Sequence, residues 1–367
     1  MRVDVAVVGG GIAGVGVAAE LAERGATVAV LEQEDRLAHH SSGRSAATFL
    51  ESYGSPEIRA LTRASRRDLE LVEPDRAPLL THRPLLWVAG AADVSTVEGL
   101  VAGEPLLRAA ELDEARSLCP VLRPEWLAAA AVEEGAQDLD VAGLFDRYRR
   151  RAVRAGVTMS TAAGVVSGVR VGEAWRLDTA TGPVEAAVVV NAAGAWADMV
   201  ASALGVAPVG LRPLRRTVAI VSSDQVRRDW PFVGEVCDAF YFRPEGDALL
   251  LSPADETPSA PVDARADAED VALALDRANE ATTLNLRHVR TAWAGLRTFA
   301  PDRNPVVGPD PAQAGFFWLA GQGGYGMQTA PALSRLAAAL AWGEPVPADL
   351  TAQGLDLTRL TPGRLTS

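Results

Sequence analysis

The spacing of hydrophobic positions is clearest in the first forty residues of the chain. Residues 3–8 are apolar at nearly every position, which is typical of a parallel strand buried on both faces. A helix is predicted over 14–24, ending at Gly25, a residue suited to the left-handed conformation past a helix end. A second apolar run follows at 27–31. The order strand, helix, strand predicts a parallel βαβ unit.

The remaining pattern predicts two kinds of region. Short strands alternate with a loop rich in Pro and Asp and with one helix between 206 and 292, which indicates an antiparallel sheet. We therefore expect an α/β fold with an α+β second domain. The predicted discontinuous Rossmann-like dinucleotide-binding domain comprises 1–78, 138–205 and 293–367, and the predicted substrate domain comprises 79–137 and 206–292. Helices are expected at 56–71, 111–118, 141–154, 267–280 and 327–340, and strands at 79–90 (broken at Pro84), 128–132, 165–171, 175–178, 184–190, 216–221, 239–243, 248–252 and 315–321.

Glycines fill the turn between the first strand and its helix, in the spacing Gly9-x-Gly11-x-x-Gly14. Gly9 permits a tight turn, Gly11 permits close approach of the backbone to a pyrophosphate, and Gly14 permits close packing of helix and strand. The phosphates would lie at the helix N-terminus, where unpaired N–H groups point outward. Glu32 ends the second strand, where a carboxylate can accept hydrogen bonds from ribose hydroxyls. These features predict a dinucleotide site, whereas an ordinary glycine-rich turn would leave Glu32 unexplained.

Composition narrows the class of protein. A length of 367 residues favours two domains, and 48% hydrophobic with 22% charged residues is typical of a soluble globular protein. The net charge of −12 argues against nucleic acid and anionic membranes as partners. No apolar run is long enough to span a bilayer, and the glycine-interrupted N-terminus does not resemble a signal peptide. With Cys119 and Cys237 as the only cysteines, we expect no disulfide framework and a cytoplasmic location.

Missing residue types exclude several kinds of chemistry. The chain has no lysine, so its 35 basic residues are all arginines. A lysine Schiff base with pyridoxal phosphate and a P-loop lysine are therefore both excluded. Its four histidines are not spaced as metal ligands, and we expect no metal site.

Two later segments, 41–47 and 191–196, are rich in small residues. Such residues allow close backbone approach to a ligand. The first segment could equally begin a helix with Ser41 or Ser42 as N-cap. The second follows a predicted buried strand, as the glycine turn follows the first strand, and so indicates a second point of ligand approach.

Three segments together, 9–14, 191–196 and 320–328, resemble the FAD-dependent D-amino acid oxidase and glycine oxidase-like superfamily. The similarity is strongest to bacterial D-arginine dehydrogenase-like proteins, and it also includes 42–47, 53–54, 59–62 and 293–297. The resemblance implies FAD as the cofactor and oxidation of an amine carbon next to a carboxylate by hydride transfer to the flavin. The imino acid would then hydrolyse to a 2-oxo acid and ammonia. Relatives with a flavin-linking cysteine carry it where this chain has Gly295, so non-covalent FAD is expected.

The resemblance also assigns residues to the site. A carboxylate clamp of two arginines and two tyrosines matches Arg216, Arg297, Tyr53 and Tyr241, and a guanidinium fork is suited to binding a carboxylate through two hydrogen bonds. The expected substrate pocket comprises Thr48, Leu50, Leu85, Trp87 and Gln328. The expected FAD-binding residues are Gly9, Gly11, Ile12, Ala13, Gly14, Glu32, Gln33, Ser41, Ser42, Arg44, Ser45, Ala46, Ala193, Gly194, Trp196, Gly295, Gly323, Gly324, Tyr325, Gly326, Met327 and Gln328.

The residues themselves leave other readings open. An arginine at a strand edge, such as Arg216, is usually solvated, and tyrosines more often pack than bind ligands. Arg297 lies in an apolar stretch, where a buried arginine needs an anion. The turn 323–326 could be a simple connection, although its N–H groups would stabilise negative charge on a reduced flavin.

The sequence also departs from its relatives. The strand at 83–87 has no acid where proteins selective for basic D-amino acids carry one, and Thr48 and Leu50 stand where those relatives have histidine and threonine. These changes predict a substrate with a neutral or apolar side chain. The resemblance implies that sarcosine-oxidase relatives activate oxygen with a lysine, so the absence of lysine here favours a dehydrogenase over an oxidase. The expected electron acceptor is a quinone, a carrier or oxygen. Alternatives are oxidation of N-alkyl amino acids, glycine or cyclic amines, and a non-catalytic flavin-binding subunit or NAD-binding module.

Overall fold

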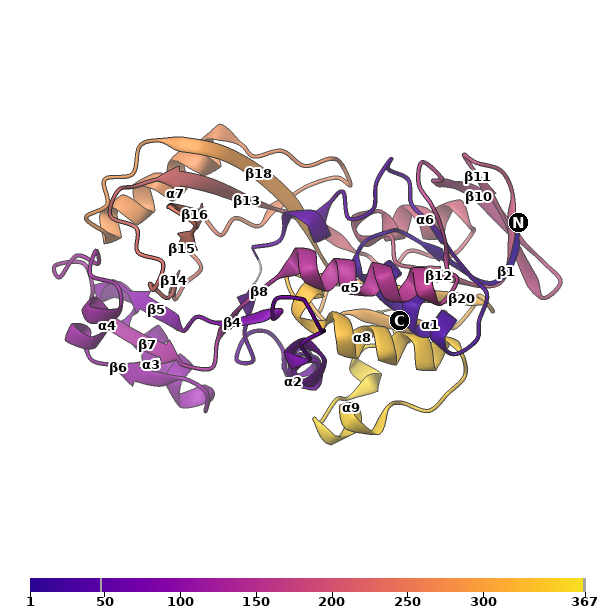
Figure 1. Ribbon diagram of the computed structural model, residues 1–367, viewed down its shortest axis with the longest axis horizontal. Helices are drawn as coiled ribbons and strands as arrows, with labels where there is room; N and C mark the ends of the chain where they lie inside the picture. The colour runs from indigo at the N-terminus through magenta and orange to yellow at the C-terminus, as the bar shows by residue number, and fades with distance from the viewer. Residues whose placement is uncertain (47, 366–367) are drawn as a thin grey trace.

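The computed structural model describes residues 1–46 and 48–365, and Figure 1 shows its elements grouped around two sheets. The first sheet is built on the predicted N-terminal βαβ unit. Its parallel strands lie in the order β20-β12-β1-β2-β9, and antiparallel strands flank them. The strands are β1 (Arg2–Val8), β2 (Val28–Leu31), β9 (Thr158–Ser160), β10 (Val165–Val171), β11 (Ala174–Thr179), β12 (Val184–Asn191), β19 (Val306–Pro309) and β20 (Phe316–Ala320).

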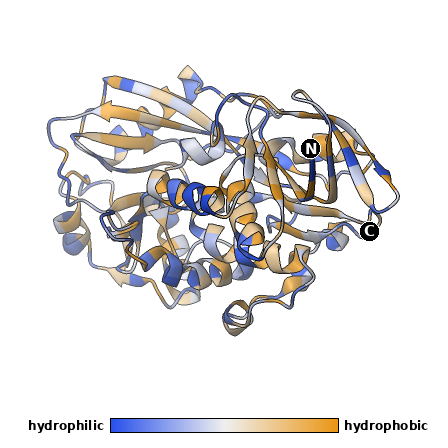
Figure 2. Ribbon diagram, turned by 45° about the vertical axis from the view of Figure 1, so that its right-hand side comes forward, coloured by the Kyte–Doolittle hydropathy of each residue, from blue (hydrophilic) through white to orange (hydrophobic). Residues whose placement is uncertain are grey.

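Helices pack on the first sheet because its inner strands are apolar on both faces. Helix α1 (Ile12–Glu23) lies against α5 (Val141–Arg154) and α8 (Gly326–Ala341), and all three contribute to one hydrophobic core. Asp140 caps α5 by accepting a hydrogen bond from the backbone N–H of Gly143 at 2.9 Å. Figure 2 shows the apolar strands inside and the hydrophilic helix faces outside.

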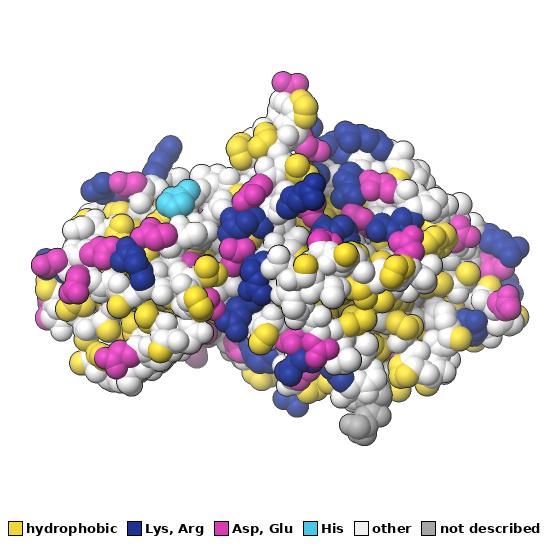
Figure 3. Space-filling model, turned by 90° about the horizontal axis from the view of Figure 1, so that it is seen from below, with side chains coloured by type: hydrophobic (Ala, Val, Ile, Leu, Met, Phe, Trp, Pro, Cys, Tyr) yellow, Lys and Arg dark blue, Asp and Glu magenta, His cyan; other side chains and the backbone are white. Residues whose placement is uncertain are grey.

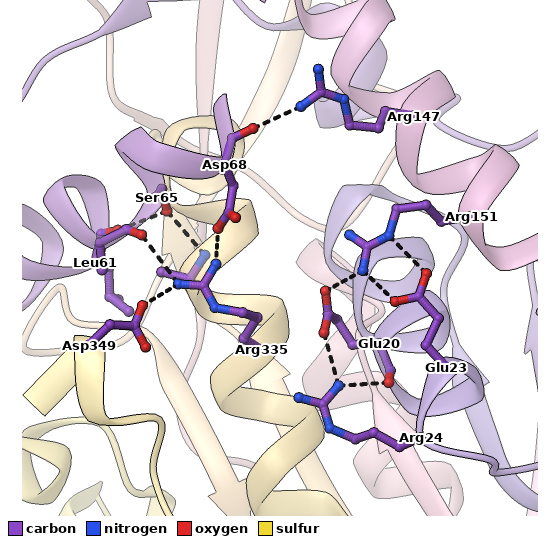
Figure 4. A network of polar contacts seen from close by, with 12 residues as sticks. Glu20, Glu23, Arg24, Leu61, Ser65, Asp68, Arg147, Arg151, Arg335 and Asp349 are labelled. Atoms are coloured by element: carbon purple, nitrogen blue, oxygen red, sulfur yellow. Dashed lines mark hydrogen bonds and ion pairs between the residues drawn. The ribbon is translucent and has the colours of Figure 1, made fainter. Parts of the chain in front are cut away.

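Ion pairs between arginines and carboxylates link neighbouring helices of this part of the fold (Figure 4). Arg151 of α5 binds Glu20 and Glu23 of α1. Arg335 of α8 binds Asp68, which lies on α2 (Pro56–Glu70), and Asp349 of α9 (Ala348–Ala352). Positive and negative side chains are likewise interspersed over the face shown in Figure 3.

The second sheet has the order β21-β18-β13-β16-β15-β14-β5-β7-β6. Its two long strands, β13 (Arg212–Ser222) and β18 (Val289–Phe299), pair antiparallel along most of their length. The pair formed by β14 and β5 is parallel, so the sheet is mostly but not wholly antiparallel. The other strands are β5 (Leu85–Ala89), β6 (Arg108–Ala110), β7 (Ala129–Glu133), β14 (Phe232–Glu235), β15 (Tyr241–Glu245), β16 (Ala248–Ser252), β17 (Thr257–Pro258), which pairs with β13, and β21 (Gln322–Gly323).

Short elements complete the fold. A small sheet, β3 (Thr48–Phe49), β8 (Gln137–Leu139) and β4 (Leu80–His82), lies between the two large sheets (Figure 1). The other helices are α3 (Val94–Gly103), α4 (Leu112–Leu118), α6 (Ala197–Ala203) and α7 (Ala268–Ala281), with 3-10 turns η1 (Ser41–Arg44), η2 (Ala91–Asp93), η3 (Gly194–Trp196), η4 (Leu357–Arg359) and η5 (Pro362–Leu365). Within the described residues no helix is both long and apolar enough to cross a membrane.

The predicted α/β fold with its Rossmann-like part is confirmed, and two details differ. Strand β18 runs through position 293, so residues 293–299 belong to the second sheet and the predicted domain boundary falls inside a strand. The predicted N-cap role of the serines in η1 is wrong, because both hydroxyls bond to distant segments. Ser41 donates to the carbonyl of Leu296 at 2.7 Å, and Ser42 accepts from the N–H of Ile12 at 3.0 Å. Ala47, at the end of the predicted ligand-approach segment, lies outside the described residues.

The contact between α1 and α8 tests the close packing of the first core. A Cβ atom added at Gly16 would collide with the hydroxyl of Ser334. We expect Gly16→Ala to lower the free energy of unfolding by about 1–3 kcal/mol, measured by urea denaturation. The loss should shrink in a Ser334→Ala background. A Gly16→Ala protein more stable than the parent, as helix propensity alone would give, would contradict the packing.

Candidate functional site

A cleft runs from the glycine turn after β1 to the face of β13 and β18. Of the residues predicted for the site, Gly14 and Leu85 do not line it. Gly14 instead lies against the carbonyl of Gly9, with no room for a Cβ, as expected for packing of the helix on the turn. The prediction that Leu85 lines the pocket is wrong, because its side chain is wholly buried in the same hydrophobic core as Trp87. The other predicted site residues all reach the cleft.

The glycine turn forms one end of the cleft. Gly9 has φ +108°, and a Cβ there would lie 2.5 Å from the carbonyl oxygen of Ala192. Helix α1 has no acidic residue in its first turn, so its positive end is open to an anion. Gly11, by contrast, is crowded only by the hydroxyl of Ser42, at 3.1 Å. The geometry is that of a turn over which phosphates can lie.

Glu32 is fixed beside this turn. Its carboxylate accepts hydrogen bonds from the backbone N–H of Gly10 at 2.6 Å and of Glu34 at 2.9 Å, and the residue is 7% exposed. A side chain at Gly10 would collide with this carboxylate, so the middle glycine of the motif is also constrained. The sequence analysis left Gly10 out, although the run of three glycines could have indicated it.

A loop from the second sheet covers this half of the cleft. Asp263 forms an ion pair with Arg44, whose guanidinium also donates to the carbonyls of Ala264 at 2.8 Å and Ala294 at 3.0 Å. His40 Nε2 lies 2.9 Å from Glu34 Oε1, and its ring is 4.4 Å from that of Trp196. The sequence did not indicate the role of His40 or of Asp263, because both depend on contacts between distant segments.

The two arginines of the predicted clamp lie together at the other end. In the pairing of β13 with β18, Arg216 is opposite Gly295 and Leu214 is opposite Arg297. Arg216 and Arg297 are therefore diagonal neighbours on one face of the sheet. Gly295 lines the cleft opposite Arg216, and a Cβ there would be in ordinary contact with Arg44 and Ser41, the nearest atom being 3.6 Å away.

Their surroundings differ. Arg216 is 6% exposed, and its Nε donates to the carbonyl of Asp255 at 2.7 Å. The guanidinium of Arg297 has no hydrogen bond or ion pair among residues 1–46 and 48–365. Burial lowers the pKa of Arg297, but three tyrosines and Asp238 more than offset this effect, so its pKa is raised. Arg297 is therefore a cation without a partner, and the backbone of Gly324 lies on it so closely that a Cβ would be 2.8 Å away.

An unpaired donor lies beside these cations. Tyr241 is 7% exposed, its ring is stacked on Phe232 at 5.3 Å, and its buried hydroxyl has no hydrogen-bond partner within the part of the chain that the structure describes. The guanidinium of Arg216 is 5.9 Å from the same ring. Buried polar groups without partners are costly unless a ligand completes them. A carboxylate would satisfy both the hydroxyl and the free cation.

The side-chain amide of Gln328 is hydrogen-bonded to residues of the pocket wall and is not free to bind a substrate. Its Oε1 accepts from the N–H of Leu50 at 3.1 Å, and its Nε2 donates to the Leu50 carbonyl at 3.3 Å and to Thr62 at 2.9 Å. Tyr53 is placed nearby, with its ring 5.3 Å from that of Tyr325. Ser52, one residue earlier, donates to the buried Glu133. The Tyr53 loop is therefore anchored to the second sheet.

The cleft also contains residues that the sequence analysis missed, above all Asp238. No acid lies on the strand 83–87, as expected, but the neighbouring strand β14 leads into a turn where Asp238 has φ +57° and faces the cleft. Burial raises the pKa of Asp238, whereas Arg216 and Arg297 oppose the rise. The missed apolar lining includes Val218, Phe232 and Phe240.

Comparison with known proteins decides the family. A family model described as FAD dependent oxidoreductase (DAO) matches residues 4–340. The chain belongs to the DAO family. FAD is its cofactor, and the positive-φ glycine turn, the open end of α1 and the fixed Glu32 fit a dinucleotide.

The individual relatives share less than a third of their residues with this chain in the matched regions. Glycerol-3-phosphate dehydrogenase 1 of Mycobacterium tuberculosis (strain ATCC 25618 / H37Rv) is 29% identical over 80% of this chain, which spans 62% of that relative's length. Mitochondrial dimethylglycine dehydrogenase of Rattus norvegicus is 25% identical over 99% of the chain and 45% of its own length. The crystal structure of glycine oxidase from Geobacillus kaustophilus superposes with a TM-score of 0.84 at 25% identity, covering 98% of both chains. The chain is thus similar to oxidoreductases with different substrates.

Glu32 provides a test of the cofactor site. We expect Glu32→Ala to weaken FAD binding about tenfold, because one charge-assisted contact to the ribose is lost. Titration of the apoprotein with FAD, followed by quenching of flavin fluorescence, measures the dissociation constant. Glu185→Ala, on β12 of the same sheet, is the matched control and should not change it. Equal affinities of the Glu32→Ala protein and the parent would remove Glu32 from the cofactor site.

Proposed function

We propose that this DAO-family protein oxidises a D-α-amino acid with a neutral or apolar side chain to the imino acid, which hydrolyses to a 2-oxo acid and ammonia. The observation that carries the proposal is the unpaired guanidinium of Arg297 beside the unpaired hydroxyl of Tyr241, in the cleft that also contains the dinucleotide turn. FAD, when bound, supplies the two-electron acceptor. The protein's task is then to orient the amino acid.

The arginines orient the substrate through its carboxylate. A guanidinium fork binds a carboxylate through two parallel hydrogen bonds and so fixes the Cα atom next to it. Positioning of this kind accounts for much of the rate enhancement that a reaction without acid–base residues needs. The substrate's amine is proposed to enter unprotonated, so no side-chain base is required.

The pocket next to the clamp favours an apolar side chain. Leu50, Trp87, Val218 and Phe232 belong to one hydrophobic cluster and all line the cleft. An apolar side chain gains free energy there by leaving water. Asp238 also lines this part of the cleft. The D configuration rests on the resemblance to D-amino acid oxidising proteins.

A second candidate is oxidation of N-alkyl amino acids. It is supported by the similarity to dimethylglycine dehydrogenase, which extends over almost the whole chain. The carboxylate clamp would serve such a substrate equally well, because the two classes differ only at the nitrogen and Cα.

A substrate panel separates these candidates. The purified holoprotein is mixed anaerobically with D-, L- and N-methyl amino acids, and bleaching of the flavin absorbance is recorded. We expect D-amino acids with apolar side chains to reduce the flavin fastest and D-aspartate to be among the slowest. Reduction by L- or N-methyl amino acids alone would refute the proposed substrate class.

The clamp itself predicts a kinetic effect. Arg297→Met should lower kcat/KM by about a hundredfold or more, since two charge-assisted hydrogen bonds to the carboxylate are lost. Steady-state or stopped-flow reduction of the flavin measures it. Arg290→Met, an exposed position on the same strand, is the control and should retain the parent rate. If both variants react like the parent, the carboxylate clamp is wrong.

A further inference from the structure

A carboxylate of the protein itself lies close to the clamp. Glu256 Oε1 is 3.6 Å from Nη2 of Arg216, which is close enough for an ion pair but longer than a hydrogen bond. The neighbouring acid, Asp255, is occupied elsewhere, because its carboxylate accepts hydrogen bonds from the N–H of Thr217 at 2.6 Å and from its hydroxyl at 3.2 Å. Glu256 is therefore placed to compete with a substrate carboxylate for Arg216.

Arg303 holds Glu256 at this distance. Both oxygens of Glu256 accept hydrogen bonds from the guanidinium of Arg303, at 2.8 and 3.0 Å. The oxygen bound at 2.8 Å is the one that lies 3.6 Å from Arg216. Burial raises the pKa of Glu256, but Arg303, Arg216 and Arg297 outweigh this effect, so its pKa is lowered and the group is ionised at neutral pH.

The position of Arg303 is itself well supported. Its guanidinium lies over the ring of Phe299, 3.9 Å from the centroid. Gly323 lies against that ring with no room for a Cβ atom. Arg303 has φ +64°, a left-handed conformation that is unfavourable for a residue other than glycine. An unfavourable backbone conformation at a residue whose side chain is held by such contacts suggests that the position of the Arg303 guanidinium matters for function.

We propose that Arg303 is a positioning residue that keeps Glu256 from closing on Arg216, and so leaves Arg216 available to the substrate carboxylate. The inference rests on the proposed function, because it requires that Arg216 binds a carboxylate ligand. Without Arg303, a movement of less than 1 Å would bring Glu256 within hydrogen-bond distance of Arg216, since an N–H···O bond spans about 2.9 Å. The binding site would then be occupied by an internal anion.

Removal of Arg303 tests this inference. Arg303→Gly is the first variant, because glycine adopts the left-handed conformation without strain. We expect the dissociation constant of benzoate, a carboxylate without an amine, to rise about tenfold when measured by its perturbation of the flavin spectrum. KM for the amino acid should rise similarly, with kcat within about twofold of the parent, because bound substrate is oriented as before.

A double variant distinguishes competition from simple disruption. Glu256→Gln combined with Arg303→Gly should restore benzoate affinity to within about twofold of the parent, because the competing charge is gone. Arg303→Asn, which also tolerates a positive φ, should behave like Arg303→Gly. Arg290→Ala removes another Arg–carboxylate pair, with Asp247, and should not change the affinity.

The possible results separate this inference from the function on which it rests. An unchanged benzoate affinity in Arg303→Gly, or a loss that Glu256→Gln does not restore, overturns the role of Arg303. If Arg216→Met also leaves the affinity unchanged, the clamp is wrong as well. If Arg216→Met weakens binding while Arg303→Gly does not, only the role of Arg303 fails. Melting temperatures of all variants show whether each protein is folded.

Discussion

The antiparallel pairing of β13 with β18 is the constraint on which the candidate active site depends. It sets Arg216 opposite Gly295 and Arg297 two residues further along, so that both guanidinium groups share one face of the sheet. A slip of one residue in either strand would turn one of the arginines to the other face. The ladder keeps one register from Arg212 to Ile220, which makes such a slip costly, and the pairing thereby fixes the position of two like charges that would otherwise separate.

The turn η1 connects the two ends of the cleft. Its serines bond to the start of α1 and to β18, and Arg44 bonds to the loop at 263–264 and to β18. One short turn thus links the dinucleotide end to the strand that carries Arg297. A cofactor bound over the glycine turn is thereby held in a fixed relation to Arg297, as the proposed carboxylate clamp would require.

All 35 of the Lys and Arg residues of this protein are arginines, and the forked guanidinium appears in two different situations. On the helix surfaces several of these forks are paired with carboxylates, as between Arg151 and the acids of α1. In the cleft, Arg297 has no hydrogen bond or ion pair among the described residues, and Glu256, which is bound by Arg303, lies 3.6 Å from Arg216. Unpaired charge in a cleft is unfavourable for the folded protein alone, so its presence indicates a ligand that completes it.

The sequence by itself determined the elements whose signals are local. The glycine turn, Glu32 at the end of β2, and helix α5 with its Asp140 cap all depend on residues close together in the chain, and all are found in the structure. From the residues alone, Arg216 could not be distinguished from a solvated surface arginine. Only the resemblance to the family paired it with Arg297. Only the tertiary structure showed that Asp238, Asp263 and the Glu256–Arg303 pair lie at or near the cleft. Their contacts depend on strand register and on loops that meet across the cleft, and no local pattern in the sequence encodes such distant pairings.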